Sequence, residues 1–431
     1  MLYDNLSVNG QGHLTFAGYD TVQLAAEFGT PSMFLDEARI RSRCREYKAA
    51  MAETMPEGSC PSYAGKAFSC KAICRIMAEE GMHLDVVSPG EMMTAYCAGF
   101  PMEDVYFHGN SKSDADIAFA MEHGAGHFIC DSADELHAID RIAGEKGIRQ
   151  KVLLRLTPGI DPHTHEKIST GRIDCKFGAA IETGQAEELV LLALSKENVE
   201  LEGYHCHIGS QIFDPEPFHD AARLMLEFLA HIGNTHGFFA PVLDLGGGLG
   251  VPYTEDQPKV DYGACVRQVG LWVQELCSQL GIAVPVILME PGRSIIADAG
   301  ITLYTVNSIK SIPGFKNYVA VDGGMTDNPR YTLYEAVYTA TVANRAGEKA
   351  DYPCTLAGRC CESGDLIGEN FLLPQPQRGD VVAVLTTGAY NYSMASHYNR
   401  VAKPPVILIT EDGPKVAIRR ETAEDIMRCD M

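Results

Sequence analysis

The pattern of apolar and polar positions changes with a regular rhythm from about residue 62 onward. Segments such as 218–232 and 262–280 carry apolar residues at three- and four-residue steps, which is typical of helices with one buried face. Between such segments lie short apolar runs that we predict to be strands. Eight strands that alternate with helices predict a parallel (β/α)8 barrel, with an open doubly wound sheet as the alternative. The eight runs are 62–66, 83–88, 105–109, 127–132, 151–157, 201–208, 242–246 and 286–290.

After about residue 298 the pattern becomes that of an all-β domain. Short apolar runs there are separated by Gly and Pro clusters, which favours strands joined by turns. Residues 14–16 are also strand-like, and we expect them to pair with the carboxy-terminal strands. The chain is thus predicted to contain a barrel over 33–298 and a discontinuous β domain made of 1–32 and 299–431. The predicted strands of the latter are 301–309, 318–321, 339–342, 381–385 and 406–409.

Charge and composition exclude several function classes. The 431 residues carry 35 Lys and Arg against 57 Asp and Glu, a net charge of −22. Such an acidic chain is a poor partner for nucleic acid or for an anionic membrane surface. The amino terminus lacks the basic and apolar segments of a signal peptide, and the 14 cysteines show no disulfide or CxxC spacing. We therefore expect a cytoplasmic enzyme or binding protein with reduced cysteines.

Two of the predicted barrel strands end in charged residues, and the active sites of such barrels form at these strand ends. Lys66 ends the first strand, where a desolvated lysine can form a Schiff base with an aldehyde; a lysine that reaches the solvent-exposed rim is the alternative. Glu290 ends the last strand, where a carboxylate can keep a pyridine nitrogen protonated. A salt bridge between Glu290 and Arg293 at the rim is the plainer interpretation.

Two other strand ends carry histidines and glycines. Strand geometry places His205 and His207 on one face, so a metal site is one interpretation, although neighbouring residues supply no third ligand at a plausible spacing. His207 stacked on a planar cofactor is the other, and His205 is then a buried core residue. His163 and His165 form a second alternating pair in a Pro- and Gly-rich loop. The glycines at 246–248 and 250 can bring backbone N–H groups close to a phosphate, but the turn lacks a dinucleotide-binding fingerprint.

Several longer motifs resemble those of the diaminopimelate decarboxylases, which are fold-type III pyridoxal-phosphate enzymes. The resemblance covers nearly the whole chain, and its motifs occur in the family's order. They are YAGKA, DVVSPGE, FHGNSKS, PGIDPHTHEKISTG, KFG, HCHIGSQ, LDLGGGLG, EPGRS, MTDNPRYTLY, CCESGD and GAYNYSMAS.

The resemblance implies a fold, a cofactor, an assembly and a role for each matching residue. The fold is a (β/α)8 barrel with a discontinuous β domain, the cofactor is pyridoxal 5'-phosphate, and the assembly is a homodimer with shared active sites. Lys66, His207, Glu290 and Cys361 are implied to be catalytic, with Cys361 of the partner subunit as the proton donor. Cofactor contacts are implied for Lys66, Asp85, His207, Ser210, Gly247, Gly248, Glu290, Gly292, Arg293 and Tyr390. Substrate contacts are implied for Arg293, Arg330, Tyr334, Glu362 and Tyr390.

The implied reaction is decarboxylation of meso-2,6-diaminopimelate to L-lysine and carbon dioxide, the last step of lysine biosynthesis. Arginines such as Arg330 beside a cofactor pocket suit a second carboxylate on the substrate, and Glu362 suits a distal ammonium. Alternatives are a sister decarboxylase for another basic amino acid or a carboxylated polyamine, a non-catalytic cofactor-binding protein, and a metallohydrolase. The adjacent Cys360 leaves open which of the two thiols faces the substrate.

Overall fold

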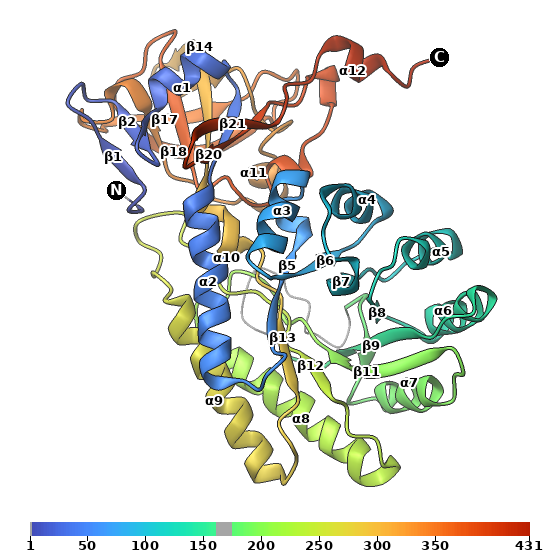
Figure 1. Cartoon of the computed structure of the whole chain (residues 1–431). Helices are drawn as coiled ribbons and strands as arrows, with labels where there is room; N and C mark the ends of the chain where they lie inside the picture. Colours follow the sequence, from blue (N-terminus) through green and yellow to red (C-terminus); the bar gives the residue numbers. More distant parts are fainter. Residues whose placement is uncertain (1, 161–174) are drawn as a thin grey trace. The chain divides into compact units, whose positions relative to one another are not determined.

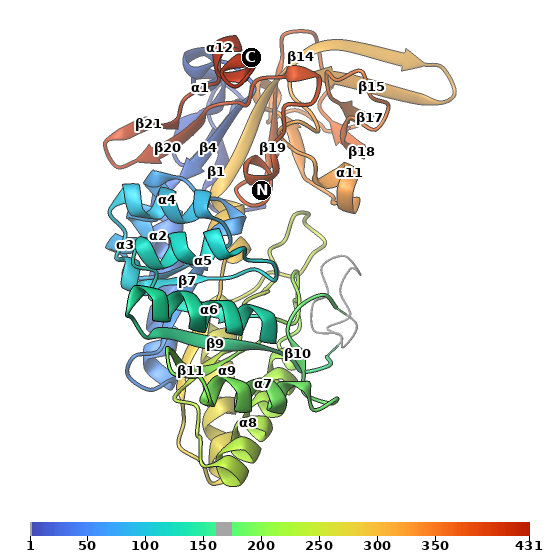
Figure 2. The same ribbon diagram turned by 90° about the vertical axis from the view of Figure 1, so that its right-hand side faces the viewer.

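The structure, a computed structural model, describes residues 2–160 and 175–431, and these divide into two compact units. We call residues 41–250 and 260–294 the barrel unit, and residues up to Ile40, 251–259 and 295–431 the β unit. The motif histidines His163 and His165 lie outside the described residues. Figures 1 and 2 show the course of the chain through both units.

The barrel unit contains eight parallel strands that close into a ring. Neighbouring strands pair in the order β9-β11-β12-β13-β5-β6-β7-β8, and pairing between β8 and β9 completes the circle. The closed ring confirms the predicted barrel and excludes an open sheet. A short strand β10 (Ala179–Ala180) pairs with β9 outside the ring. The ring strands are β5 (Cys60–Ala64), β6 (His83–Val86), β7 (Val105–Phe107), β8 (His127–Cys130), β9 (Gln150–Thr157), β11 (Val199–His205), β12 (Val242–Asp244) and β13 (Val286–Met289).

Helices surround the barrel strands, as Figure 1 shows. The two helices expected from apolar periodicity are α8 (Glu216–His236) and α9 (Tyr262–Leu280). Side-chain caps fix where several helices begin, because Ser88 and Ser132 each accept a backbone N–H from the first turn of α4 and α6. The helices of this unit also include the last residues of α2 (Glu37–Thr54), α3 (Lys71–Glu79), α4 (Pro89–Ala98), α5 (Asp114–Glu122), α6 (Ala133–Lys146) and α7 (Gln185–Leu194).

The β unit contains two sheets. The small sheet consists of β1 (Leu6–Val8), β2 (Leu14–Phe16) and β3 (Tyr19–Asp20). The larger sheet has the order β18-β17-β15-β14-β4-β20-β21, with β19 pairing β14 and β16. β14, the longest strand of this sheet, forms with β15 a hairpin that extends away from the rest of the sheet (Figure 2). The strands are β4 (Ser32–Asp36), β14 (Gly300–Ile312), β15 (Lys316–Val321), β16 (Ala340–Val342), β17 (Tyr352–Ala357), β18 (Leu366–Leu373), β19 (Val381–Leu385), β20 (Val406–Thr410) and β21 (Gly413–Ile418).

The expected pairing of residues 14–16 was wrong, although these residues do belong to the β unit. β2 pairs with β1 and β3, whereas β4 is the amino-terminal strand that pairs with β14 and β20. Leu14 and Phe16 instead point into a core that they share with Ile301 and Ile407. The packing of side chains, not strand pairing, therefore joins this segment to the carboxy-terminal strands.

The division into units differs from the predicted boundaries at three places. Residues 33–40, 251–259 and 295–298 group with the β unit instead of the barrel. β4 explains the first difference, since its backbone pairs with β14 and β20. The second segment includes Tyr253, whose carbonyl oxygen accepts a hydrogen bond from Thr339 at 2.8 Å. The remaining helices of the β unit are α1 (Thr21–Phe28), α10 (Arg293–Ile296, whose first two residues belong to the barrel unit), α11 (Arg330–Tyr334) and α12 (Ala423–Met427).

All fourteen cysteines are free thiols in the structure. In the part of the chain that the structure describes, no helix combines the length and apolar character needed to cross a membrane.

Candidate active site

Lys66 and Asp85 lie at the carboxyl ends of neighbouring barrel strands. Lys66 follows β5 in a single 3-10 turn, Gly65–Ala67, and its side chain is exposed. Asp85 in β6 is buried and accepts a hydrogen bond from the Ser62 hydroxyl. Gly65 packs so closely on β6 that a Cβ at this position would lie 2.7 Å from the Asp85 carbonyl oxygen. The glycine therefore lets the lysine-bearing turn rest directly on the next strand.

Glu290 follows β13 and forms the centre of a buried cluster. Its Oε1 lies 3.0 Å from Nε2 of His205 and 3.2 Å from Nε2 of His108. Burial alone raises the pKa of Glu290, but the two imidazoles outweigh that effect and hold the pKa well below the ordinary carboxyl range. Burial lowers the pKa of His205 to about 4, against the opposing effect of Glu290. At neutral pH the cluster therefore contains an ionised Glu290 and a neutral His205.

Asp244, at the end of β12, is the second acid of this cluster. Burial, together with the carboxylates of Glu290 and Asp85, raises the pKa of Asp244 well above its ordinary value. Its Oδ1 accepts the backbone N–H of Gly246 at 2.8 Å. Asp244 therefore resists ionisation beside the ionised Glu290.

The glycine turn after β12 packs tightly against two other strand ends. A Cβ at Gly247 would lie 2.0 Å from the Glu290 carbonyl oxygen, and one at Gly248 would lie 2.3 Å from that of Gly209. The backbone N–H of Gly247 donates to Nδ1 of His207 at 3.3 Å. Close packing therefore explains these glycines, and the Gly247 N–H orients the His207 ring.

Arg293 and Ser210 form a pair suited to an anion. Arg293 is buried, and its guanidinium donates to the Ser210 hydroxyl, with Nη2 and Oγ 3.1 Å apart. The alternative of a rim salt bridge between Glu290 and Arg293 is wrong, because the ion-pair partners of Glu290 among the described residues are His205 and His108. Gly292 packs against Ala64, where a Cβ would lie 3.0 Å from that residue's Cβ.

In the β unit, Arg330 is buried among aromatic side chains. Its guanidinium lies 4.9 Å from the ring centre of Tyr253 and donates to the Tyr338 hydroxyl at 2.9 Å. That hydroxyl donates in turn to Oδ1 of Asn391 at 3.1 Å. Within residues 2–160 and 175–431, Arg330 has no acidic partner. Tyr334, at the end of α11, is half-buried.

The two adjacent cysteines differ in their surroundings. Cys361 and the neighbouring Glu362 are exposed, and the backbone N–H of Cys361 donates to Oδ1 of Asn399 at 2.9 Å. Cys360 is half-buried, its backbone N–H donates to Oδ2 of Asp365 at 2.6 Å, and burial together with Asp365 raises its thiol pKa to about 11. Cys361 is therefore the more accessible of the two thiols.

Tyr390 lies in a strained loop of the β unit. Its φ is 61°, in the left-handed region that is unfavourable for a bulky residue. Nearby, a Cβ at Gly388 would lie 1.8 Å from the carbonyl oxygen of Ile296. The loop after β19 thus has a backbone that the packing around it imposes.

The sequence analysis missed several charged residues at the barrel strand ends. His108 follows β7, Asp244 ends β12, and Glu91, whose Oε2 accepts the Val87 N–H at 2.6 Å, lies on α4. Lys66 lowers the pKa of Glu91, although burial has the larger, raising effect. Inspection of all eight strand ends, and not only four, would have identified His108 and Asp244.

The candidate metal ligands in the structure differ from the pair of histidines expected from the sequence. β11 ends at His205, so strand alternation does not extend to His207. The described residues whose ligand atoms all lie within 4.8 Å of one another are His108, His205 and Glu290. A buried acid–imidazole cluster and a metal site are therefore two interpretations of the same three side chains.

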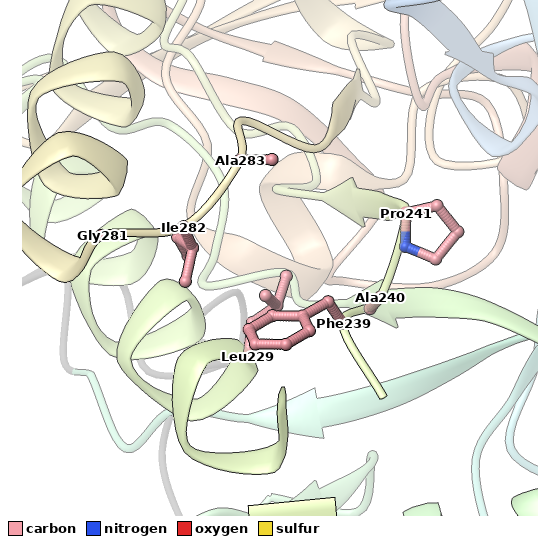
Figure 3. Close-up of a pocket in the computed structure, with 7 residues that line it drawn as sticks. All are labelled: Leu229, Phe239, Ala240, Pro241, Gly281, Ile282 and Ala283. Carbon is pink, nitrogen blue, oxygen red and sulfur yellow. The ribbon is translucent and has the colours of Figure 1, made fainter. Parts of the chain in front are cut away.

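A pocket at the opposite end of the barrel lacks groups for catalysis. It is lined by apolar residues and backbone between α8, the start of β12 and the end of α9 (Figure 3). The lining residues are Leu229, Phe239, Ala240, Pro241, Gly281, Ile282 and Ala283. None of the seven described residues that line this pocket has a titratable side chain.

The groups at those strand ends fit pyridoxal phosphate. The exposed amine of Lys66 suits the aldehyde of the cofactor, and the buried, ionised Glu290 suits its pyridine nitrogen. The imidazole of His207 suits its flat ring, and the pair of Ser210 and Arg293 suits its phosphate. The fit rests on the kinds of donor and acceptor present.

Comparisons with known proteins agree with this chemistry. Residues 37–297 match the family model described as the pyridoxal-binding domain of pyridoxal-dependent decarboxylases. The chain is 44% identical over 423 residues to the diaminopimelate decarboxylase of Bacillus subtilis, covering 98% of this chain and 96% of that protein. It is 44% identical over 414 residues to the Bacillus methanolicus enzyme of the same name, covering 96% of each. Diaminopimelate decarboxylase from M. jannaschii, solved in complex with L-lysine, superimposes with a TM-score of 0.90 at 33% identity, covering 99% of this chain and 98% of that one.

Proposed function

The chain belongs to the pyridoxal-dependent decarboxylases, and from this premise we propose that it converts meso-2,6-diaminopimelate to L-lysine and carbon dioxide. It is a carboxy-lyase whose cofactor is pyridoxal 5'-phosphate. The reaction is the last step of lysine biosynthesis. The relatives with the same name that match nearly the whole chain support this substrate over other amino acids.

The observation that carries the substrate assignment is the buried Arg330. A guanidinium with hydroxyl and aromatic neighbours, and no acidic partner in the described part of the chain, is ready to bind an anion. Diaminopimelate has a second carboxylate far from the reacting carbon, whereas ornithine and lysine have none. Tyr334 on the same short helix, Arg293 and Tyr390 are the further groups that we assign to the substrate, and Glu362 is assigned to its distal ammonium.

In the barrel unit, each group has a distinct task toward the cofactor. Lys66 would hold its aldehyde carbon, Glu290 would keep a proton on its ring nitrogen, and His207 would lie against its ring. Ser210 and Arg293 would bind its phosphate, together with Tyr390 and the backbone at Gly247, Gly248 and Gly292, while Asp85 would lie near Lys66. When bound, pyridoxal phosphate supplies an electron-withdrawing ring that accepts the electron pair left at Cα as carbon dioxide departs.

Cys361 supplies the proton that replaces the lost carboxylate. Its exposed position next to Glu362 supports this role, whereas Cys360 is partly enclosed beside Asp365. A thiol that protonates the substrate carbon acts as a general acid.

We further propose a cytoplasmic homodimer in which Cys361 of the partner subunit completes each active site. Lys66→Ala and Cys361→Ala subunits test this directly, because each variant alone lacks one required group. Mixing the two purified variants and allowing subunits to exchange restores activity if the site is shared. Activity that stays absent after verified exchange contradicts a shared site.

The experiment that tests the function is carbon dioxide release from the purified protein supplied with pyridoxal phosphate. Meso-diaminopimelate, L-ornithine, L-arginine and L-lysine are offered separately. We expect release from diaminopimelate alone, with L-lysine as the product. Release from another substrate would make the protein a sister decarboxylase, and no release from any would favour the non-catalytic or metal-dependent alternatives.

A further inference from the structure

The imidazoles of His205 and His108, which surround Glu290, are not needed to explain the proposed binding of cofactor and substrate. His205 is fully buried at the end of β11, and His108 is buried directly after β7. Both present Nε2 to the same oxygen of Glu290, at 3.0 and 3.2 Å. Their rings meet edge to face, with centres 5.2 Å apart, so each restricts the orientation of the other.

We propose that His205 and His108 are positioning residues that act on the cofactor through Glu290. Both present Nε2 to Oε1 of the carboxylate within ion-pair distance, and neither contact has hydrogen-bond geometry in the structure. With the cofactor bound, each imidazole donates an Nε2–H to this oxygen, and the negative charge of Glu290 is kept for the protonated ring nitrogen of pyridoxal phosphate. The inference rests on the proposed function, since it concerns how the chain holds that cofactor.

The neutral charge state of His205 makes this arrangement effective. A cationic imidazole would neutralise Glu290 by itself and leave a pyridinium without a counter-ion. A neutral imidazole donates a hydrogen bond, which stabilises the carboxylate without cancelling its charge. The low pKa of His205 agrees with the neutral form, and it has burial as its main cause.

The other ionisable groups near the cluster favour the same state. Burial and the carboxylates of Glu290 and Asp85 raise the pKa of Asp244 well above its ordinary value, which opposes a second negative charge beside Glu290. Asp85 lies 3.6 Å from Nε2 of His108 and is hydrogen-bonded by Ser62. Burial is the main cause that lowers the pKa of His205, and Arg155 lowers it further, which favours a neutral ring.

Matched substitutions separate the hydrogen bond from the bulk of the side chain. In His205→Gln the amide nitrogen reaches the position of Nε2 and can still donate to Glu290. In His205→Asn the amide stops one atom short, so the polar character remains while the contact is lost. The same pair at His108, the double Asn variant, and Glu290→Gln as a reference for a lost carboxylate complete the set.

The probe is pyridoxal 5'-phosphate labelled with nitrogen-15 in the ring, bound to the full-length protein. The nitrogen-15 shift reports protonation of the ring nitrogen as pH is varied, without any turnover. The dissociation constant of the cofactor is measured in parallel. We expect His205→Asn to lower the apparent pKa of the ring nitrogen by about one unit or more, a tenfold change in the protonation constant. We expect His205→Gln to restore most of it.

Several results would overturn the inference. The Asn and Gln variants could give the same titration, or the double Asn variant could keep the ring nitrogen protonated over a pH range in which Glu290→Gln loses the proton. Equimolar zinc retained by the wild type and lost in His205→Asn would make the cluster a metal site. Failure of the wild type to bind the cofactor would overturn the proposed function as well, whereas normal binding and carbon dioxide release with unaltered nitrogen-15 titrations would overturn this inference alone.

Discussion

The functional groups of the barrel unit and of the β unit are prepared in different ways. In the barrel unit, Glu290 has its polar partners within the same unit, in His205 and His108. In the β unit, Arg330 is buried without an acidic partner in the described residues, and Cys361 is exposed. A site for a permanent cofactor can be ordered in advance by its own chain. Groups that bind a transient substrate keep their charge or their exposure until that substrate arrives.

The largest effect on the barrel unit is expected from removal of the Lys66 amine. Lys66→Ala is expected to lower carbon dioxide release by more than about 10⁴-fold, as the loss of a covalent group typically does. Lys71→Ala, an exposed lysine at the start of α3, is the matched control and should be unaffected. Near-normal turnover by Lys66→Ala would mean that another amine holds the cofactor.

Substitutions of the two adjacent cysteines test the role of the β unit. Cys361→Ala is expected to lower kcat by about 10² to 10⁴-fold, because a general acid is lost. Cys360→Ala should retain most of its activity, since that side chain is partly enclosed beside Asp365. Steady-state rates with diaminopimelate for the two variants decide the matter, and a reversed order would assign the proton to Cys360.

The pH dependence of stability extends the comparison, because the β unit also contains a buried acid with a raised pKa. Burial raises the pKa of Asp327 from 3.8 to about 7, against the lowering effect of its hydrogen bond from Tyr304. A carboxyl with a raised folded-state pKa favours folding below its unfolded value, and this contribution is lost as pH rises from about 4 to about 7.

Asp327→Asn removes that titration. Relative to the wild type, the variant should gain roughly 1–3 kcal/mol of unfolding free energy between about pH 4 and about pH 8. Urea unfolding of both proteins at the two pH values measures it. An equal pH dependence in wild type and variant would show that Asp327 is ionised in the folded protein throughout.

The smallest expected effect belongs to the exposed Glu362. An exposed ion pair contributes little, so Glu362→Gln should raise KM for diaminopimelate by about two- to fivefold with little change in kcat. Glu348→Gln, another exposed acid of the β unit, is the control. An equal KM for Glu362→Gln and wild type would remove Glu362 from the substrate site.

The sequence predicted the barrel well because its strands and helices differ in periodicity. All eight predicted strands exist, and α8 and α9 contain the two predicted helical segments. The β unit was harder to predict: β17, β18 and β21 have mixed burial along their length and no clear apolar alternation. The partners of β2 and β4 are set by packing across long stretches of chain, which local patterns do not contain.

The candidate site was predictable where one residue carries the chemistry by its type. Lys66 and Glu290 were found from their places at strand ends, and the motifs added Arg330 and Cys361. His108 could have been found from its place after the strand at 105–109, but its contact with Glu290 across the barrel is visible only in the structure. The burial of Arg330, and the different environments of Cys360 and Cys361, likewise depend on three-dimensional packing.

The most direct test of the central claim compares wild type with Arg330→Met on two substrates, meso-diaminopimelate and L-lysine. Methionine fills the buried space with no charge, and the lost charged hydrogen bonds should reduce kcat/KM for diaminopimelate by about 10- to 100-fold. Lysine, which has no distal carboxylate, should be a poor substrate for both proteins, with the same low rate. An unchanged kcat/KM for diaminopimelate in a folded, cofactor-loaded Arg330→Met protein would contradict the account.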